Sequence, residues 1–136
     1  MYCIALDNNH LNIIKRLNYI PVGLGKNKFS NEWLKDNSGN NISFKNPHYG
    51  EYTFHYWIWK NYLDKLNKKW IGFCQYRKFW IKGAVKKKSI SFNELNEFIL
   101  KKIPNKYENY ESILGEPFYV NKFKFSKFMK RGFKKM

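Results

Sequence analysis

Residues 36–80 read DNSGNNISFKNPHYGEYTFHYWIWKNYLDKLNKKWIGFCQYRKFW, and this stretch decides the fold. It begins as a polar loop, continues as an aromatic segment with helical spacing, and ends in an apolar run followed by Tyr76, Arg77 and Lys78. The loop, residues 36–46, supplies an acid, several amides, a hydroxyl and a glycine, which can hydrogen-bond a ligand or their own backbone. No other stretch of the sequence is dense enough in such groups to predict a site.

The aromatic segment is predicted to form one buried helix. Asn46 and Pro47 form a start signal, because asparagine caps free backbone N–H groups and proline suits the first helical position. Apolar side chains then recur at steps of three and four up to about residue 66, which predicts a shared buried face. The residues of this stripe are Tyr49, Tyr52, Tyr56, Trp59, Leu63 and Leu66, and Phe54, Trp57, Ile58 and Tyr62 widen it.

Three short apolar segments predict strands. Residues 70–74 form a near-continuous apolar run, which is typical of a central strand covered on both faces in a parallel α/β sheet. Residues 2–6 predict a buried first strand, and residues 19–23 predict a second extended segment. Ligands of open α/β sheets bind outside the carboxyl ends of the strands, so Arg77 is expected at a ligand crevice.

Two later segments carry helical patterns. Ser91 followed by Glu94 forms a capping box, which predicts the start of a helix. Residues 121–136 hold seven basic and no acidic residues, interleaved with phenylalanine and methionine at helical spacing. This basic-aromatic C-terminal segment is expected to pack on the domain as an amphipathic helix, and the alternative is a helix lying against an anionic membrane surface.

The composition limits the classes of function. With 136 residues, 43% of them hydrophobic and 20% aromatic, the chain is predicted to fold as a single domain. The net charge is +16, but only three of the 26 basic residues are arginines, as an AT-rich coding sequence would produce without a nucleic-acid partner. Cys3 and Cys74 lie far apart in strand-like settings and are predicted to be reduced core residues.

Several kinds of site are excluded by spacing. Asp7, Asp36 and Asp64 are isolated and the histidines lack ligand spacing, so no metal site is predicted. Hydrolase and P-loop patterns are missing. No apolar run reaches the roughly 20 residues that span a bilayer, so a cytoplasmic location is expected, with peripheral contact at the inner membrane face through residues 121–136. The alternative is a non-catalytic basic module that binds nucleic acid or an anionic membrane surface, although no recognised nucleic-acid-binding motif is present.

Three motifs carry a family resemblance. The chain reads DNSGNNISFKN at residues 36–46, YWIWKN at 56–61 and IGFCQYRKF at 71–79, and YIPVG at 19–23 adds an early match. These motifs resemble the capsular and exopolysaccharide glycosyltransferase family known as domain of unknown function 4422. Its pattern reads approximately D-N-T-G-D-N-I-S-x-K-N-x-x-Y-C-E-L-T-A-x-Y-W-x-W-K-N, then Y-I-G-L-x-H-Y-R-R-Y-F. The resemblance covers about residues 19–80, the core motif region.

The resemblance implies a fold and an activity. Residues 1–136 are expected to form a single, incomplete glycosyltransferase-like domain, an α/β GT-A-like three-layer sandwich with a mostly parallel sheet. Such a domain transfers a sugar from a nucleotide-diphosphate sugar donor to a glycan or lipid-linked acceptor in surface polysaccharide biosynthesis. No cofactor is expected within this chain, and a divalent metal would depend on ligands from the half of the family domain that the chain does not cover.

The resemblance also assigns residue roles. A leaving diphosphate needs positive charge or N–H donors, and an acceptor hydroxyl needs a carboxylate to orient or activate it. Asp36 and Glu51 are therefore the catalytic candidates. The nucleotide-sugar-binding candidates are Asn37, Asn41, Asn46, Tyr76, Arg77 and Lys78. The chain departs from the pattern at Asn40, Gly50, Tyr52, Gln75 and Lys78, where the family has an acid, a cysteine, a leucine, a histidine and an arginine.

Overall fold

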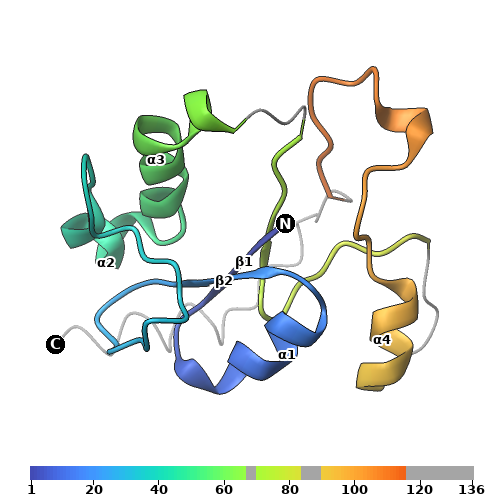
Figure 1. The fold of residues 1–136 in the computed structure, drawn as a ribbon, viewed down its shortest axis with the longest axis horizontal. Helices are drawn as coiled ribbons and strands as arrows, with labels where there is room; N and C mark the ends of the chain where they lie inside the picture. Colours follow the sequence, from blue (N-terminus) through green and yellow to red (C-terminus); the bar gives the residue numbers. More distant parts are fainter. Residues whose placement is uncertain (67–69, 84–89, 116–136) are drawn as a thin grey trace, which may run out of the picture.

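The computed structural model describes residues 1–66, 70–83 and 90–115, which form an α/β fold (Figure 1). Within these residues the sheet has three parallel strands in the order β2-β1-β3. The strand β1 (Tyr2–Ala5) pairs with β2 (Ile20–Gly23) on one side and with β3 (Phe73–Gln75) on the other. Because the strands are parallel, their carboxyl ends meet at one edge of the sheet, where a ligand site is expected.

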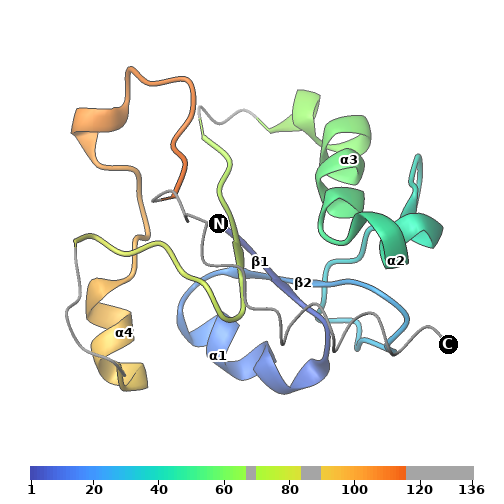
Figure 2. The same ribbon diagram turned by 180° about the vertical axis from the view of Figure 1, so that it is seen from behind.

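The sheet separates two apolar layers, because successive side chains of a strand point to opposite faces. Cys3 and Ala5 of β1 pack in one cluster with Ile14 of α1 (Leu11–Arg16). Tyr2 and Ile4 pack in a second cluster with the buried face of α3 (Tyr52–Asn61). Figures 1 and 2 show α1 and α3 on opposite sides of the strands. The expected three-layer arrangement of helix, sheet and helix is therefore present in the described part of the chain.

The remaining elements are short. The helix α4 (Phe92–Phe98) confirms the predicted capping box, since Ser91 N donates to Glu94 Oε2 at 3.0 Å and Glu94 N donates to Ser91 Oγ at 3.4 Å. The predicted amphipathic helix at 121–136 lies outside the described residues. None of the described helices has the length and apolar character needed to cross a membrane. Single turns of 3-10 helix lie at η1 (Asn8–His10), η2 (Ser43–Lys45), η3 (Leu63–Lys65) and η4 (Asn105–Tyr107).

The strand predicted at residues 70–74 is present as a shorter parallel strand covered on both faces, but it is not central within the described sheet. The strand there is β3, which begins only at Phe73 and lies at the edge of the described sheet, whereas β1 is central and buried at all four positions. The apolar character of residues 70–74 has a different cause. Ile71 and Phe73 pack against the cluster that faces α3, so side-chain packing accounts for the run without a second neighbouring strand.

The aromatic segment does not form one continuous helix. The first part, α2 (Asn46–Tyr49), ends at Gly50, whose φ of 56° and ψ of −131° lie outside the helical region. The role of Asn46 as a helix cap is also wrong, because Lys45 occupies the cap position. The side-chain amide of Asn46 instead donates to Gly50 O at 2.9 Å and to Thr53 Oγ1 at 3.2 Å, which ties the break to the first turn of α3.

The buried face of α3 differs from the predicted stripe. Its buried residues are Thr53, Phe54, Trp57 and Ile58. Most of the predicted stripe faces solvent, as shown by Tyr52, which is 66% exposed. Aromatic residues are so frequent in this segment that two helical faces satisfy the same spacing, and the break at residue 50 separates the first turn from the rest.

The break at Gly50 gives a stability prediction. Gly50→Ala is expected to lower the free energy of unfolding by about 1–3 kcal/mol, because an L side chain is strained at this positive φ. No heavy atom lies within 4 Å of a Cβ built at Gly50, so the cost comes from the backbone alone. The matched control is Gly83→Ala, where a Cβ also meets open space and the φ is not positive. Urea unfolding that shows equal values for both variants would contradict the prediction.

The cysteine prediction is confirmed. Cys3 and Cys74 are free and buried, and they are direct partners in the parallel register of β1 and β3. The hydrogen bond with Cys3 and burial of the thiol raise the pKa of Cys74 far above its usual range. Cys74 therefore serves the core as a protonated thiol at neutral pH.

Candidate functional site

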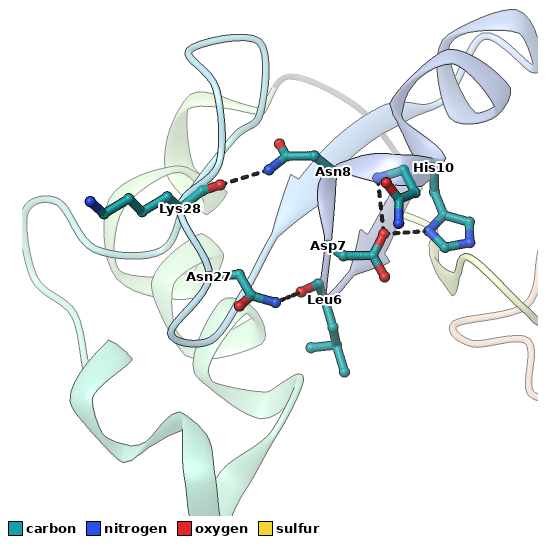
Figure 3. A network of polar contacts seen from close by, with 7 residues as sticks. Leu6, Asp7, Asn8, His10, Asn27 and Lys28 are labelled. Atoms are coloured by element: carbon teal, nitrogen blue, oxygen red, sulfur yellow. Dashed lines mark hydrogen bonds and ion pairs between the residues drawn. The ribbon is translucent and has the colours of Figure 1, made fainter.

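The loops that follow β1 and β2 are tied together at the carboxyl edge of the sheet (Figure 3). The side-chain amide of Asn8 donates to Lys28 O at 2.6 Å, and its oxygen accepts from Ser30 N at 3.3 Å. The amide of Asn27 donates in the opposite direction, to Leu6 O. These reciprocal contacts hold the turn after β2 in place without regular secondary structure.

A cavity, here called the larger cavity, lies beside this turn. Its volume is about 630 Å³, and its walls come from the turn after β2, the loop before α2 and the start of α2. Gly23, at the end of β2, makes this shape possible, because a Cβ there would lie 2.5 Å from Cγ of the Phe29 ring. The lining residues are Gly23, Gly25, Lys26, Asn27, Lys28, Phe29, Lys35, Asp36, Asn37, Ser43, Phe44, Asn46 and Pro47.

Asp36 is the acidic residue of the larger cavity. Its exposed fraction is only 4%, and its Oδ2 is buried without a hydrogen-bond partner among the described residues. A buried carboxylate oxygen without a partner costs free energy unless a donor or a cation reaches it. Asp36 also lines the cavity, so a ligand donor that displaces the groups covering this oxygen would gain an acceptor there.

Three lysines give the larger cavity positive charge. Lys26, Lys28 and Lys35 line it, and within the described residues none of them forms an ion pair. Three ammonium groups and one carboxylate favour a ligand that carries several negative charges together with hydrogen-bond donors.

The polar loop at residues 37–41 is positioned by α3. Trp57 Nε1 donates to Ser38 O at 2.7 Å, and Asn61 exchanges two hydrogen bonds with the backbone of Asn40, at 2.8 and 3.0 Å. Asn41 folds the loop locally, since its Oδ1 accepts from Ser43 N and Ser43 Oγ. The loop that precedes the cavity wall is thus fixed by the buried side of α3.

Removing the Asn61 side chain tests this support. Asn61→Ala is expected to lower the free energy of unfolding by about 0.5–1.5 kcal/mol, because water replaces its two hydrogen bonds to the exposed backbone of Asn40. The same variant is expected to weaken the binding of any ligand in the larger cavity, since the loop loses its fixed position. Asn31→Ala, at an exposed position, is the control for urea unfolding. Equal stability of the two variants would contradict the prediction.

A smaller cavity of about 160 Å³ lies at the same edge of the sheet. Gln75, the last residue of β3, donates from Nε2 to both carboxylate oxygens of Glu51 at 2.9 Å. Asn46 lines both cavities, so the two are neighbours. The lining residues of the smaller cavity are Ile4, Leu6, Leu24, Asn46, Gly50, Glu51, Gln75, Tyr76 and Arg77.

His55 lies one helical turn after Glu51 and adds no positive charge at neutral pH. Burial lowers the pKa of His55, and the negative charge of Glu51 opposes this effect only in part. The ring packs on Phe73 at 4.4 Å between centroids. Arg77 is therefore the cation of the smaller cavity.

The predicted site residues divide between the two cavities. Asn46 lines both, and Asn41 and Lys78 line neither. The larger cavity receives Asp36 and Asn37, and the smaller one receives Glu51, Tyr76 and Arg77.

The lysines of the larger cavity were missed by the sequence analysis. The turn Gly23-Leu24-Gly25 followed by Lys26 and Lys28 is too short to match a phosphate-binding motif. The available signal was its position directly after a strand that pairs with the central strand. Within the described residues, no group of three or more His, Cys, Asp or Glu side chains could hold a metal ion.

Comparison with protein families gives one match. The model of the family described as "Domain of unknown function (DUF4422)" matches residues 3–131. The chain belongs to the DUF4422 family. No curated protein and no solved structure matches it. The family description names no activity, so the function of this DUF4422 chain has to be argued from the two cavities at the carboxyl edge of the sheet.

Proposed function

We propose that this DUF4422 chain forms the donor-binding part of a GT-A-like glycosyltransferase. It would transfer a sugar from a nucleoside diphosphate sugar to a glycan or lipid-linked acceptor, at the cytoplasmic face of a membrane during surface polysaccharide synthesis. The observation that carries the proposal is a cavity lined by three lysines and by Asp36, whose Oδ2 atom is buried without a partner among the described residues. A nucleoside diphosphate sugar matches both features, because its diphosphate is anionic and its ribose and sugar present hydroxyl donors.

The size and position of the larger cavity support this ligand class. A volume of about 630 Å³ falls in the range of roughly 300–1,000 Å³ that is typical of small-molecule sites. The cavity lies at the carboxyl edge of a parallel sheet, where α/β folds bind nucleotides. The hydrogen bonds of Asn8 and Asn27 hold the turn that carries Lys26 and Lys28, so the backbone from which these lysines would reach a diphosphate is already fixed.

The proposed reaction uses the carboxylates of both cavities. Asp36 accepts hydrogen bonds from donor hydroxyls and orients the sugar, and the lysines neutralise the diphosphate. An acceptor hydroxyl oxygen forms a bond to the anomeric carbon, while the bond between that carbon and the diphosphate oxygen breaks. The electron pair leaves with the nucleoside diphosphate, and the hydroxyl proton passes to the carboxylate of Glu51.

A second candidate function is binding to an anionic surface. Exposed aromatic side chains on α2 and α3 lie under lysine ammonium groups, as in Trp59, whose ring centroid is 3.5 Å from Lys60 Nζ. Lysine and aromatic residues together favour anionic lipid headgroups. Nucleic acid is less favoured, because the sequence offers no recognised binding motif.

Calorimetric titration with nucleotide sugars tests the proposed function. We expect the chain to bind at least one of UDP-glucose, UDP-galactose, GDP-mannose and dTDP-glucose saturably at one site, with a Kd between about 1 μM and 1 mM. The free nucleoside diphosphate should compete. The second candidate predicts instead that heparin and phosphatidylglycerol vesicles bind, with an affinity that collapses as salt rises. Binding of these polyanions, without saturable binding of any of the four nucleotide sugars, would overturn the proposal.

A further inference from the structure

The smaller cavity holds an arginine that is oriented by a chain of contacts. The Arg77 guanidinium lies 5.0 Å from the centre of the Tyr76 ring, and that ring lies 4.2 Å from the ring of His10. His10 is fixed in turn by Asp7, whose Oδ1 is 2.9 Å from His10 Nδ1. Figure 3 shows Asp7 and His10 in the loop after β1. These contacts join the loops after β1 and β3 and place the exposed guanidinium of Arg77 beside the Tyr76 ring.

Arg77 has no carboxylate partner among the described residues. Glu51 is the carboxylate that lines the same cavity as Arg77, but both of its oxygens accept hydrogen bonds from Gln75. An arginine that is held by stacking but not paired offers its planar donors to an external oxyanion. The cavity wall thus has an unused binding group for a negative charge.

The oxyanion that Arg77 would bind in the smaller cavity differs from the diphosphate of the nucleotide sugar in size and in position. The smaller cavity, of about 160 Å³, is well below the roughly 300–1,000 Å³ of sites for ligands the size of a nucleotide. The lysines that suit a diphosphate line the larger cavity instead. Because Asn46 lines both, a group in the smaller cavity would lie next to a donor in the larger one, which is the position of an acceptor.

We infer that the smaller cavity binds an acceptor sugar that carries a carboxylate, as a uronic acid does, and that Arg77 recognises this carboxylate. The inference rests on the proposed function, since it assigns the partner of the donor. A carboxylate is favoured over a phosphate because Glu51 already contributes one negative charge to the cavity, and a phosphate dianion would be repelled more strongly. A carboxylate also matches the guanidinium in a bidentate geometry.

Ligand titration followed by NMR tests the inference on the full 136-residue chain, with UDP at saturation. We expect methyl β-D-glucuronide to bind about tenfold tighter than methyl β-D-glucoside, as a charge-assisted pair provides. Arg77→Gln should abolish this preference. The control is Lys106→Gln, which also removes a cation stacked on a tyrosine, since Lys106 Nζ lies 4.7 Å from the Tyr107 ring centre. It should leave the preference unchanged.

The outcomes separate this inference from the proposed function. If UDP binds but the glucuronide and the glucoside bind equally, or neither binds, the acceptor assignment is overturned and the donor proposal stands. A preference that survives in Arg77→Gln also overturns it. Tighter binding of glucose 6-phosphate than of the glucuronide would overturn the choice of a carboxylate. If neither UDP nor any nucleotide sugar binds the chain, the proposed function itself fails.

Discussion

Asp36→Asn is expected to weaken binding of the nucleotide sugar that the chain takes by about tenfold to a hundredfold, because a ligand hydroxyl loses a charge-assisted hydrogen bond worth roughly 1.5–3 kcal/mol. The free energy of unfolding of the ligand-free chain should rise or stay unchanged. The Oδ2 atom of Asp36 is buried without a partner among the described residues, so replacing the charged group by a neutral amide removes a cost from the folded state. Calorimetry for the Kd and urea unfolding for the free energy measure the two effects on the same sample.

The opposite signs distinguish a ligand-binding role from a structural one. If the Asp36 carboxylate served only the fold, its replacement would lower the free energy of unfolding and leave the Kd unchanged. That result would contradict the prediction. Asp64→Asn is the matched control, because it makes the same chemical change at an exposed position that lines neither cavity. It should alter neither quantity.

The sequence predicted much of the carboxyl edge of the sheet. The polar loop that begins at Asp36 was expected to form a site, Asp36 itself was named from the family resemblance, and Arg77 was named from the rule that ligands lie beyond strand ends. Each of the two residues lines a cavity. Their separation into two cavities was not predictable, because it depends on the strand order β2-β1-β3. That order also brings the lysine-bearing turn after β2 to the same edge, although Lys26 lies ten residues before Asp36 in the chain.

The phase of the aromatic helix was predicted incorrectly for a physical reason. Tyrosine and tryptophan have apolar rings and polar tips, so they satisfy a buried pattern and an exposed one equally well. Six of the 14 residues from 49 to 62 are tyrosine or tryptophan, and they lie on both faces of the helix, so periodicity alone cannot choose between the two faces. Packing chooses: Phe54, Trp57 and Ile58 fit against Tyr2 and the rest of the cluster on that side of the sheet.

Phe54→Ala is expected to give the largest loss of stability, about 3–5 kcal/mol, because a fully buried aromatic side chain leaves a cavity. The Phe54 ring lies 5.4 Å from Tyr2, 5.8 Å from Trp57 and 6.2 Å from Phe73, measured between ring centres. It therefore joins β1 and β3 to α3, and through α3 it supports the loop that carries Asp36. Against a typical net stability of about 5–15 kcal/mol, the loss should be visible directly as a lower urea midpoint.

Two exposed aromatic residues serve as controls for this prediction. Phe44→Ala removes the same side chain at a position that is 74% exposed, and Tyr52→Ala removes a member of the stripe that the spacing predicted to be buried. Both are expected to change the free energy of unfolding by no more than about 0.5–1 kcal/mol. If the predicted stripe were the buried face, Tyr52→Ala would be the more destabilising change. In the observed core it is Phe54→Ala. A larger loss for Tyr52→Ala than for Phe54→Ala would mean that α3 presents the other face to the sheet, and the support of the Asp36 loop by Trp57 and Asn61 would fall with it.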